Sequence, residues 1–400
     1  MIKNIIFVII NIMKKAETIL VTILLVAMTG CVSKQSTDDL IIVDVTKSYP
    51  QKELILQDFM DVEYIPLETN DEFLTQGRVM AIGKNILLVM NRIDDGDIFV
   101  YDRNGKALRK INRKGEGGEE YLFINNIILD EENNEMFVNS VRAKKILVYD
   151  LDGKFKRSIR YPDNINYDNV HLYDKDNLIC YDSSINNKEG EERGSQSYHF
   201  MISKQDGSIT QEIFIPFKTI NSYYIFQDEY TIAAIMSEDY SIISYHDSWA
   251  LVELSSDTIY KYLPNGHLSP LIVRTPPIQS MNPPEICLLL KNITDRYYFM
   301  ETFIKAFDTK TMTVPIGNNL MYDRQENAIF EYSIFNDDYS TRRVRMMNAV
   351  NEEIAFWQVL DADRLVGANK NMELKGKLKE IAATLEEDDN PVIMLVKHRK

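Results

Sequence analysis

Residues 98–111 of this chain read IFVYDRNGKALRKI, and residues 146–159 read ILVYDLDGKFKRSI. The two stretches align without a gap, 48 residues apart. Each consists of two strand-like runs joined by Asn-Gly or Asp-Gly, which is typical of a β-hairpin with a type I′ turn. Weaker copies follow at 200–215 and, in degenerate form, at 249–263. The chain therefore contains a repeated hairpin.

A second kind of hairpin precedes the first in each period. Residues 126–137 (NIILDEENNEMF) resemble residues 319–330 (NLMYDRQENAIF), and residues 171–179 are a shorter version. Two hairpins per period make a four-stranded antiparallel unit of about 50 residues, the size of a propeller blade. The span from about residue 58 to residue 360 holds roughly six such units. The sequence thus predicts an all-β fold, a six-bladed β-propeller of four-stranded antiparallel blades.

Helical periodicity is confined to the C-terminus. An apolar stripe at helical spacing follows Asn371, a possible N-cap, and predicts one short helix containing Leu374, Leu378, Ile381 and Leu385. Residues 388–391 (DDNP) end this helix, and residues 392–396 form a closing strand. We expect that strand to complete a blade, so that the ring has no open edge.

The composition excludes several classes of protein. With 45% hydrophobic and 26% charged residues, the chain is globular. Its net charge of −15 argues against nucleic acid as a partner. Three Cys exclude a disulfide-dense scaffold, and five His leave little room for a multi-His metal site.

Residues 1–30 have the pattern of a signal peptide. A positive region at Met13-Lys14-Lys15 precedes an apolar run over 18–28 that is too short to span a bilayer. We expect translation to start at Met13, because a complete signal peptide begins there. The following Met-Thr-Gly-Cys resembles a bacterial lipobox, which predicts lipidation of Cys31. A plain secretory signal and an uncleaved anchor are the alternatives.

The domain boundaries and the location follow from this segment. Residues 31–50 are expected to be a lipidated N-terminus and linker, and residues 51–400 the propeller. Two or more acyl chains hold a soluble domain at a membrane. Val32 after the cysteine favours the outer membrane by known sorting rules, and the protein then faces either the periplasm or the cell surface.

Three stretches carry a resemblance to a known family. Residues 65–69 (IPLET) and 113–121 (RKGEGGEEY) resemble the N-terminal signature of the six-bladed β-propeller lipoproteins of Bacteroides-type bacteria, within the NHL-like or TolB-like superfamily. Gly118 stands where those proteins usually have Pro. Residues 388–396 (DDNPVIMLV) resemble their closing strand. The resemblance implies the fold, but it implies no single activity.

No reactive motif stands out, so no catalytic residue is assigned. Some six-bladed propellers are metal-dependent lactonases, whose acidic and Asn ligands converge at the central channel. By that resemblance the metal candidates are loop residues: Asp130, Asn126, His171 and Asp323. Calcium is a further possibility for the acidic stretch 94–97, although it lacks EF-hand spacing and a hairpin turn is favoured.

Other residue types have two interpretations each. Cys180 and Cys287 lie in apolar runs and are expected to be buried thiols. The aromatic groups at 223–224, 297–298 and Trp249 could stack on sugar rings, but packing within the blades is favoured. The basic run 342–345 resembles a polyanion contact, but pairing with Asp337 and Asp338 is favoured.

These observations favour a membrane-anchored lipoprotein whose propeller is a binding or scaffold module of the cell envelope. It would act as an accessory subunit or a ligand sensor, with an envelope protein or a glycan as its partner. The alternative is a metal-dependent, lactonase-like hydrolase with its site at the central channel.

Overall fold

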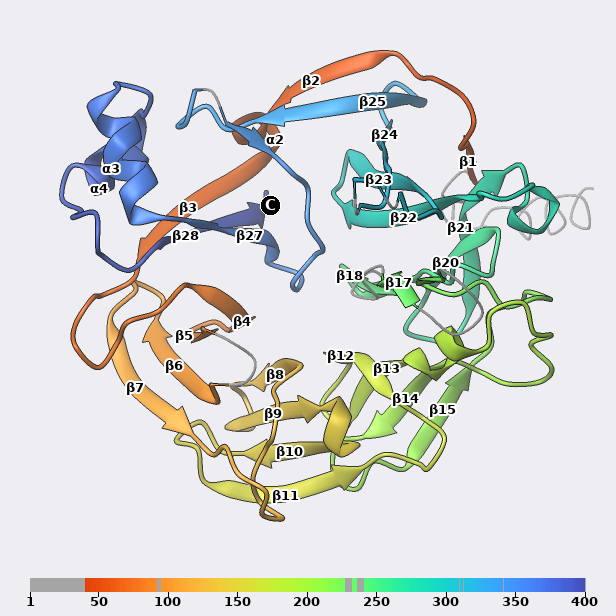
Figure 1. Cartoon of the computed structure of the whole chain (residues 1–400), viewed down its shortest axis with the longest axis horizontal. Helices are drawn as coiled ribbons and strands as arrows, with labels where there is room; N and C mark the ends of the chain where they lie inside the picture. Colours follow the sequence, from red (N-terminus) through yellow and green to blue (C-terminus); the bar gives the residue numbers. More distant parts are fainter. Residues whose placement is uncertain are drawn as a thin grey trace, which may run out of the picture. The chain divides into compact units, whose positions relative to one another are not determined.

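Six blades are arranged in a ring, as Figure 1 shows, and the ring surrounds a central channel. The structure is a computed structural model that describes residues 40–91, 95–226, 232–235, 241–308, 310–311, 313–340 and 342–399. Blades 1, 2 and 3 each have four consecutive antiparallel strands, and the first strand of each blade lies at the channel. Blade 1 consists of β4 (Arg78–Ile82), β5 (Ile86–Met90), β6 (Asp97–Asp102) and β7 (Ala107–Asn112), and blade 2 of β8 (Asn126–Asp130), β9 (Glu135–Ser140), β10 (Lys145–Tyr149) and β11 (Phe155–Arg160). Blade 3 consists of β12 (Tyr167–Leu172), β13 (Asn177–Asp182), β14 (His199–Ser203) and β15 (Ile209–Ile213). The predicted all-β, six-bladed propeller is confirmed.

Blades 4 and 5 also have four antiparallel strands each: β18 (Ile242–Tyr245), β19 (Ser248–Leu251), β20 (Thr258–Tyr262) and β21 (Leu268–Thr275); β22 (Ile286–Ile293), β23 (Tyr297–Ile304), β24 (Ile316–Asp323) and β25 (Ala328–Phe335). The short strand β26 (Arg343–Val344) pairs with the outer strand of blade 5. Before blade 4, β16 (Tyr224–Phe226) and β17 (Ile232–Ile235) form a two-stranded sheet of their own. The predicted blade pattern therefore continues past blade 3, where the sequence repeat is weak.

The N-terminal strands bind the outer edges of three blades. β1 (Ile41–Asp44) pairs in parallel with β21, and β2 (Gln51–Ile55) pairs in parallel with β25. β3 (Met60–Pro66) then completes blade 6 beside β28 (Val392–His398), which in turn pairs with β27 (Ile354–Leu360). The propeller thus begins at residue 41, which corrects the expectation that residues 41–50 belong to a linker. The predicted closing strand is confirmed.

Blade 6 lacks a laddered strand on its channel side. Asn351, just before β27, donates to the carbonyl of Ile82 at the end of β4 (3.3 Å). Gly77, just before β4, lies against Val359 near the end of β27. Because β27 therefore runs against β4, it has the direction of the second strand of a blade. The segment 346–350 lies in the place of the first strand, on the channel wall, with no ladder of its own.

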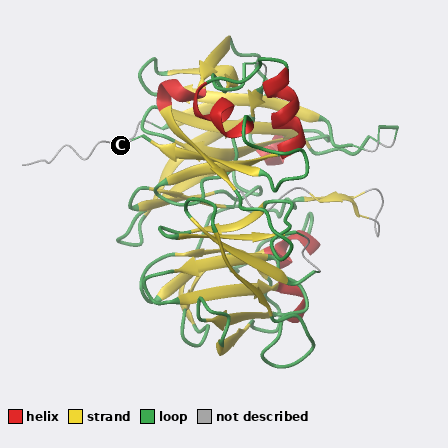
Figure 2. Ribbon diagram, turned by 90° about the vertical axis from the view of Figure 1, so that its left-hand side faces the viewer, coloured by secondary structure: helices red, strands yellow, loops and turns green. Residues whose placement is uncertain are grey.

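In the described part of the chain, three α-helices lie outside the sheets: α2 (Leu56–Phe59), α3 (Ala362–Lys370) and α4 (Gly376–Ala382). Helices are red in Figure 2. The last two connect β27 to β28, where the sequence predicted one helix. Of the predicted stripe, Leu374, Leu378 and Ile381 are buried, whereas Leu385 lies beyond the end of α4. Leu374 forms an isolated β-bridge with Tyr339, so the helix begins only at Gly376. Asn371 ends α3 and does not cap α4, which corrects its predicted role. Within the described ranges no helix is long and apolar enough to cross a membrane.

In the ranges that the structure describes, short 3₁₀ helices lie in three of the connections: η1 (Val141–Ala143), η2 (Ser183–Asn187) and η4 (Ile278–Ser280). The hydrophobic core lies between neighbouring blades rather than at the centre of the ring. One cluster joins Leu87 and Phe99 of blade 1 to Ile354 and Leu395 of blade 6. Because each sheet buries both faces in this way, the runs of its middle strands read as nearly continuous apolar sequence.

The repeated hairpins are equivalent in blades 1 to 3 only. Residues 98–111, 146–159 and 200–215 form the outer hairpins β6–β7, β10–β11 and β14–β15. In blade 4 the outer hairpin is β20–β21, whereas the predicted copy at 249–263 covers β19 and β20. The predicted position is therefore wrong by one strand. Residues 126–137 form the inner hairpin β8–β9, whereas residues 319–330 form the outer hairpin β24–β25. That match joined non-equivalent hairpins.

The hairpin glycines make a repeated contact between blades. Gly153 has φ +83°, and a Cβ on it would lie 2.6 Å from Cγ2 of Ile111 in blade 1. Gly207 meets Ile159 of blade 2 in the same way, and Gly105 meets Pro66 of blade 6. Glycine at these turns therefore serves both the backbone conformation and the packing of one blade on the next.

We expect Gly153→Ala to lower the free energy of unfolding by about 1–3 kcal/mol, because it combines a positive φ with a clash. Gly118→Ala is the matched control, since a Cβ there meets nothing within 4 Å. Urea denaturation of the two variants and the parent measures the difference. Equal midpoints for all three proteins would contradict the packing role of the turn.

Candidate functional site

The central channel has a volume of about 1640 Å³. Its wall comes from β4, β8, β12 and the hairpin turns of blades 1 to 4, and from residues 342–353 and β27 on the opposite side. A ligand pocket for one drug-sized molecule usually has about 300–1,000 Å³. The channel is therefore large enough for a ligand of several units.

Three of the four metal candidates line this channel, namely Asn126, Asp130 and His171. Asp130 is buried and already occupied: Lys204 Nζ lies 2.5 Å from its Oδ2, and the two side chains are 4% and 3% exposed. Asn133 also donates to this carboxylate (2.9 Å). A cation here would have to displace the lysine, so the pair's evident role is to join blades 2 and 3.

The other two channel candidates are also engaged in structure. Asn126 Nδ2 donates to the carbonyl of Val170 (3.2 Å), which again links blades 2 and 3. The His171 ring contacts the Asn169 amide oxygen and lies 5.7 Å from the Trp249 ring. These contacts orient the side chains along the wall without bringing them to one point.

Asp323 does not line the channel. It ends β24 near the outer edge of blade 5, between Arg296 (2.8 Å) and Lys52 of β2 (2.8 Å). Burial alone would raise the pKa of Asp323, but hydrogen bonds from Arg296 and Lys52 more than offset it and hold the pKa well below its usual range. This carboxylate fastens the N-terminal strand β2 to blade 5, which corrects its proposed place at the channel.

Three of the five histidines lie on the channel wall, although they are far apart in sequence: His171, His246 and His398. His246 Nε2 is 3.0 Å from Asp295 Oδ1, which also accepts a hydrogen bond from Tyr245 (2.8 Å). These two hydrogen bonds lower the pKa of Asp295. Burial lowers the pKa of His398.

A metal centre is not assembled in the part of the chain that the structure describes: no group of three His, Cys, Asp or Glu side chains is placed to hold a metal ion there. Of the acidic stretch 94–97, Asp94 lies outside the described residues, and Asp97 pairs with Lys110 (2.8 Å). The calcium possibility stays a prediction.

Both tryptophans of the chain line the channel. Trp249 of β19 stacks on Tyr173, with the ring centroids 6.1 Å apart at 27°. Trp357 of β27 lies on the opposite wall and has no ring partner among the described residues. The tyrosines at 223, 297 and 298 are buried, as the packing interpretation predicted. Trp357 was missed, although its rarity in the sequence was a signal.

The basic run 342–345 also lines the channel. Asp337 pairs with Lys375 (3.1 Å), and Asp338 accepts from Tyr64 (3.0 Å), so the expected pairing with these two carboxylates was wrong. Arg345 instead reaches Glu301 (2.8 Å). Arg345 is thus neutralised by a carboxylate, whereas Arg342 and Arg343 have no carboxylate partner among the described residues.

Cys180 and Cys287 are free and buried, in blades 3 and 5. Burial raises the pKa of both thiols. The prediction of buried thiols is confirmed. The signal peptide and Cys31 lie outside the described residues.

A sequence profile of a domain family of unknown function, DUF4934, matches residues 40–397. The chain belongs to this family. Comparison with curated protein sequences gives no match. Among solved structures, a putative exported protein of Bacteroides fragilis has 15% identity and a TM-score of 0.60, over 90% of this chain and 100% of that one. A DUF4221-family member from Bacteroides vulgatus has 10% identity and a TM-score of 0.46, over 85% and 97%. The first likeness shows the propeller fold.

This DUF4934 chain also has a small cavity of about 10 Å³ between blades 4 and 5, with room for about one water molecule. Glu253 and Arg274 line it and are both buried. Glu253 Oε1 accepts from the Ser255 hydroxyl (2.9 Å), whereas its Oε2 has no protein partner among the described residues. Burial raises the pKa of Glu253 to about 7.

We expect Glu253 to make folding pH-dependent. Its pKa is raised from 4.5 in the unfolded chain to about 7 in the folded protein. The contribution of the protonated carboxyl group to the free energy of unfolding is therefore fully present below pH 4.5, and about 3 kcal/mol is lost as the pH rises through 7. Glu253→Gln should match the parent at pH 4 and be more stable at pH 8, measured by urea denaturation.

His199, also buried, acts in the opposite direction, because burial lowers its pKa to about 4. Its stability contribution is present above pH 6.5 and is lost as the pH falls through 4. His199 is unchanged in Glu253→Gln, so the difference between variant and parent isolates the carboxyl group. A difference that is constant from pH 4 to pH 8 would contradict the assignment.

Proposed function

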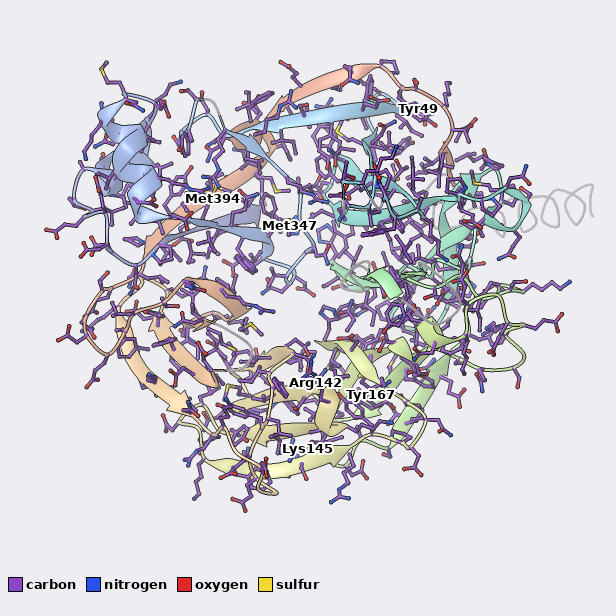
Figure 3. All side chains as sticks on the ribbon, in the orientation of Figure 1. Tyr49, Arg142, Lys145, Tyr167, Met347 and Met394 are labelled. Atoms are coloured by element: carbon purple, nitrogen blue, oxygen red, sulfur yellow. The ribbon has the colours of Figure 1, made fainter. Side chains whose placement is uncertain are left out.

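We propose that this protein is a lipid-anchored binding module of the cell envelope, whose ligand occupies the central channel. The observation that carries the proposal is the channel itself: about 1640 Å³, with histidines, both tryptophans and arginines on its wall. Figure 3 places Met347 of the channel-side segment near the middle of the ring. A rigid closed ring that presents side chains from several blades to one cavity is suited to binding.

The envelope location rests on three supports. The segment 28–31 resembles a lipobox, the exported protein of Bacteroides fragilis has the same fold, and residues 65–121 resemble the signature of propeller lipoproteins. The anchor is Cys31, and Val32 favours the outer membrane. In this proposal an accessory subunit and a ligand sensor use the channel in the same way.

The alternative of a metal-dependent hydrolase has less support in the described residues. Asp130 is neutralised by Lys204, and Asp323 is held by Arg296 and Lys52 away from the channel. The Asp295–His246 pair does lie at the channel, but no third metal-ligating side chain joins it among the described residues. Binding is therefore the function that these side chains support best.

Replacing Cys31 tests the anchor. We expect Cys31→Ala to abolish incorporation of radiolabelled palmitate and to move the protein from the membrane to the soluble fraction, because the acyl chains supply the membrane affinity. Ser33→Ala is the neighbouring control and should stay at the membrane. Retention of the Cys31→Ala variant in the membrane fraction would refute the lipid anchor.

Blocking the channel tests the binding site. Met347 is 38% exposed on the channel wall, and Leu108 is 44% exposed on the outer strand β7. Met347→Cys and Leu108→Cys can each be labelled with a bulky maleimide, because Cys180 and Cys287 are buried and Cys31 carries the lipid in this proposal.

The tagged full-length proteins are then purified from detergent-solubilised envelopes, and bound molecules are identified by mass spectrometry. We expect a bound ligand with the parent and with labelled Leu108→Cys, but not with labelled Met347→Cys. A ligand that stays bound to the blocked channel would place the site elsewhere. Recovery of the unlabelled propeller alone would contradict the binding role.

A further inference from the structure

Hydrogen-bond donors without protein acceptors among the described residues gather on one side of the channel. The guanidinium groups of Arg342 and Arg343 have no carboxylate within 4 Å and no hydrogen-bond acceptor in that part of the chain. They lie over aromatic rings instead, 5.6 Å from the Tyr339 centroid and 5.7 Å from the Phe335 centroid. Such contacts position a guanidinium group but leave its charge and its N–H groups available.

The two arginines are held by backbone contacts, so their places are set before any ligand arrives. Arg343 lies in β26, paired with Phe335 of β25. The backbone N–H of Arg342 donates to the carbonyl of Tyr339 (3.0 Å). A guanidinium fork fixed in this way matches the two oxygens of a carboxylate.

Trp357 lies on the same side of the channel. Gln358, the next residue, donates to the carbonyl of Arg345 (3.2 Å), which places the backbone of the arginine run beside β27. Because consecutive side chains of a strand point to opposite faces, Trp357 itself faces blade 1, one step along the channel wall from the arginines. The indole N–H of Trp357 donates to no protein acceptor in the described part of the chain, and its nitrogen is not sealed from solvent. The half-buried ring packs against the hydrophobic core between blades 6 and 1, and its exposed part, which lines the channel, can contact a flat, weakly polar surface.

Two guanidinium groups and an indole N–H without protein acceptors among the described residues, together with the channel-lining part of the Trp357 ring, suit a ligand that supplies negative oxygens and a stacking surface. A polar group in a half-buried wall is stabilised when the ligand provides its missing partner. A sugar ring offers its C–H face to the indole and its hydroxyl oxygens to donors. A uronic acid adds the carboxylate. The channel volume accommodates several such units.

We propose that the channel binds an acidic oligosaccharide, with its carboxylates on Arg342 and Arg343 and one sugar ring on Trp357. The inference rests on the proposed function, since it names the ligand class of the same channel. The channel lining holds seven Lys and Arg against eight Asp and Glu, so the positive charge that meets an anionic ligand is confined to the place of Arg342 and Arg343.

The experiment titrates full-length protein in detergent with oligogalacturonate, oligomannuronate and sialyllactose, and with carboxyl-reduced oligogalacturonate as the neutral match. The two tryptophans report binding by fluorescence, since both line the channel. We expect at least one acidic oligosaccharide to bind, its reduced form to bind at least tenfold more weakly, and the affinity to fall with added salt.

The variant Arg342→Gln/Arg343→Gln should lose at least a further tenfold in affinity for that oligosaccharide and keep the melting temperature of the parent, because neither side chain pairs with a carboxylate among the described residues. Arg160→Gln/Arg364→Gln removes the same charge from exposed positions outside the channel and should bind as the parent does. Trp357→Phe should lose most of the fluorescence change.

Three outcomes would overturn the inference. They are binding of none of the acidic oligosaccharides, equal affinity for the reduced form, and unchanged affinity of the double arginine variant. Binding of a polyglutamate peptide in place of every saccharide would identify an acidic peptide as the ligand and overturn it too. In each case, the channel would still be supported as the binding site if maleimide labelling of Met347→Cys removed the ligand that co-purifies with the protein. The two proposals can therefore fail separately.

Discussion

The ring depends on the pairing of β3 with β28. Seven residue pairs, from Pro66 with Val392 to Met60 with His398, join the first part of the propeller to its last strand. An open ring would leave a sheet edge unpaired and the core between blades 6 and 1 exposed. β1 and β2 extend this closure, since they add strands to the outer edges of blades 4 and 5. One N-terminal segment thereby holds three blades in place.

The remaining blades are joined by contacts that recur with the repeat. Arg109 Nε donates to the carbonyl of Leu151 (2.8 Å), and Arg157, at the same position of the next copy, donates to the carbonyl of Lys204 (3.1 Å). Lys204 in turn holds Asp130. These polar groups form hydrogen bonds and an ion pair with one another between blades. Asp130, a metal candidate in the sequence, therefore has a structural role.

The channel wall that carries Arg342, Arg343 and Trp357 lies where the repeat is interrupted. Blades 1 to 3 present regular inner strands to the channel, whereas blade 6 presents the segment 346–350, which has no ladder. Asn292 of β22 supports that segment by donating to the carbonyl of Met347 (3.1 Å). Side chains of a segment without a ladder, such as Met347, can face the channel at the cost of local regularity.

Short-range patterns were enough to predict the hairpins, the blade length and the closing strand. Asn104-Gly105 and Asp152-Gly153 require a tight turn between two strands, whatever the rest of the chain does. The place of each hairpin in its blade depends instead on long-range pairing. Asp130 and Asn126 meet the channel while Asp323 does not, because two hairpins with the same sequence pattern occupy inner and outer places in different blades. Trp249 and Trp357 are 108 positions apart, and only the closure of the ring brings their blades around one cavity.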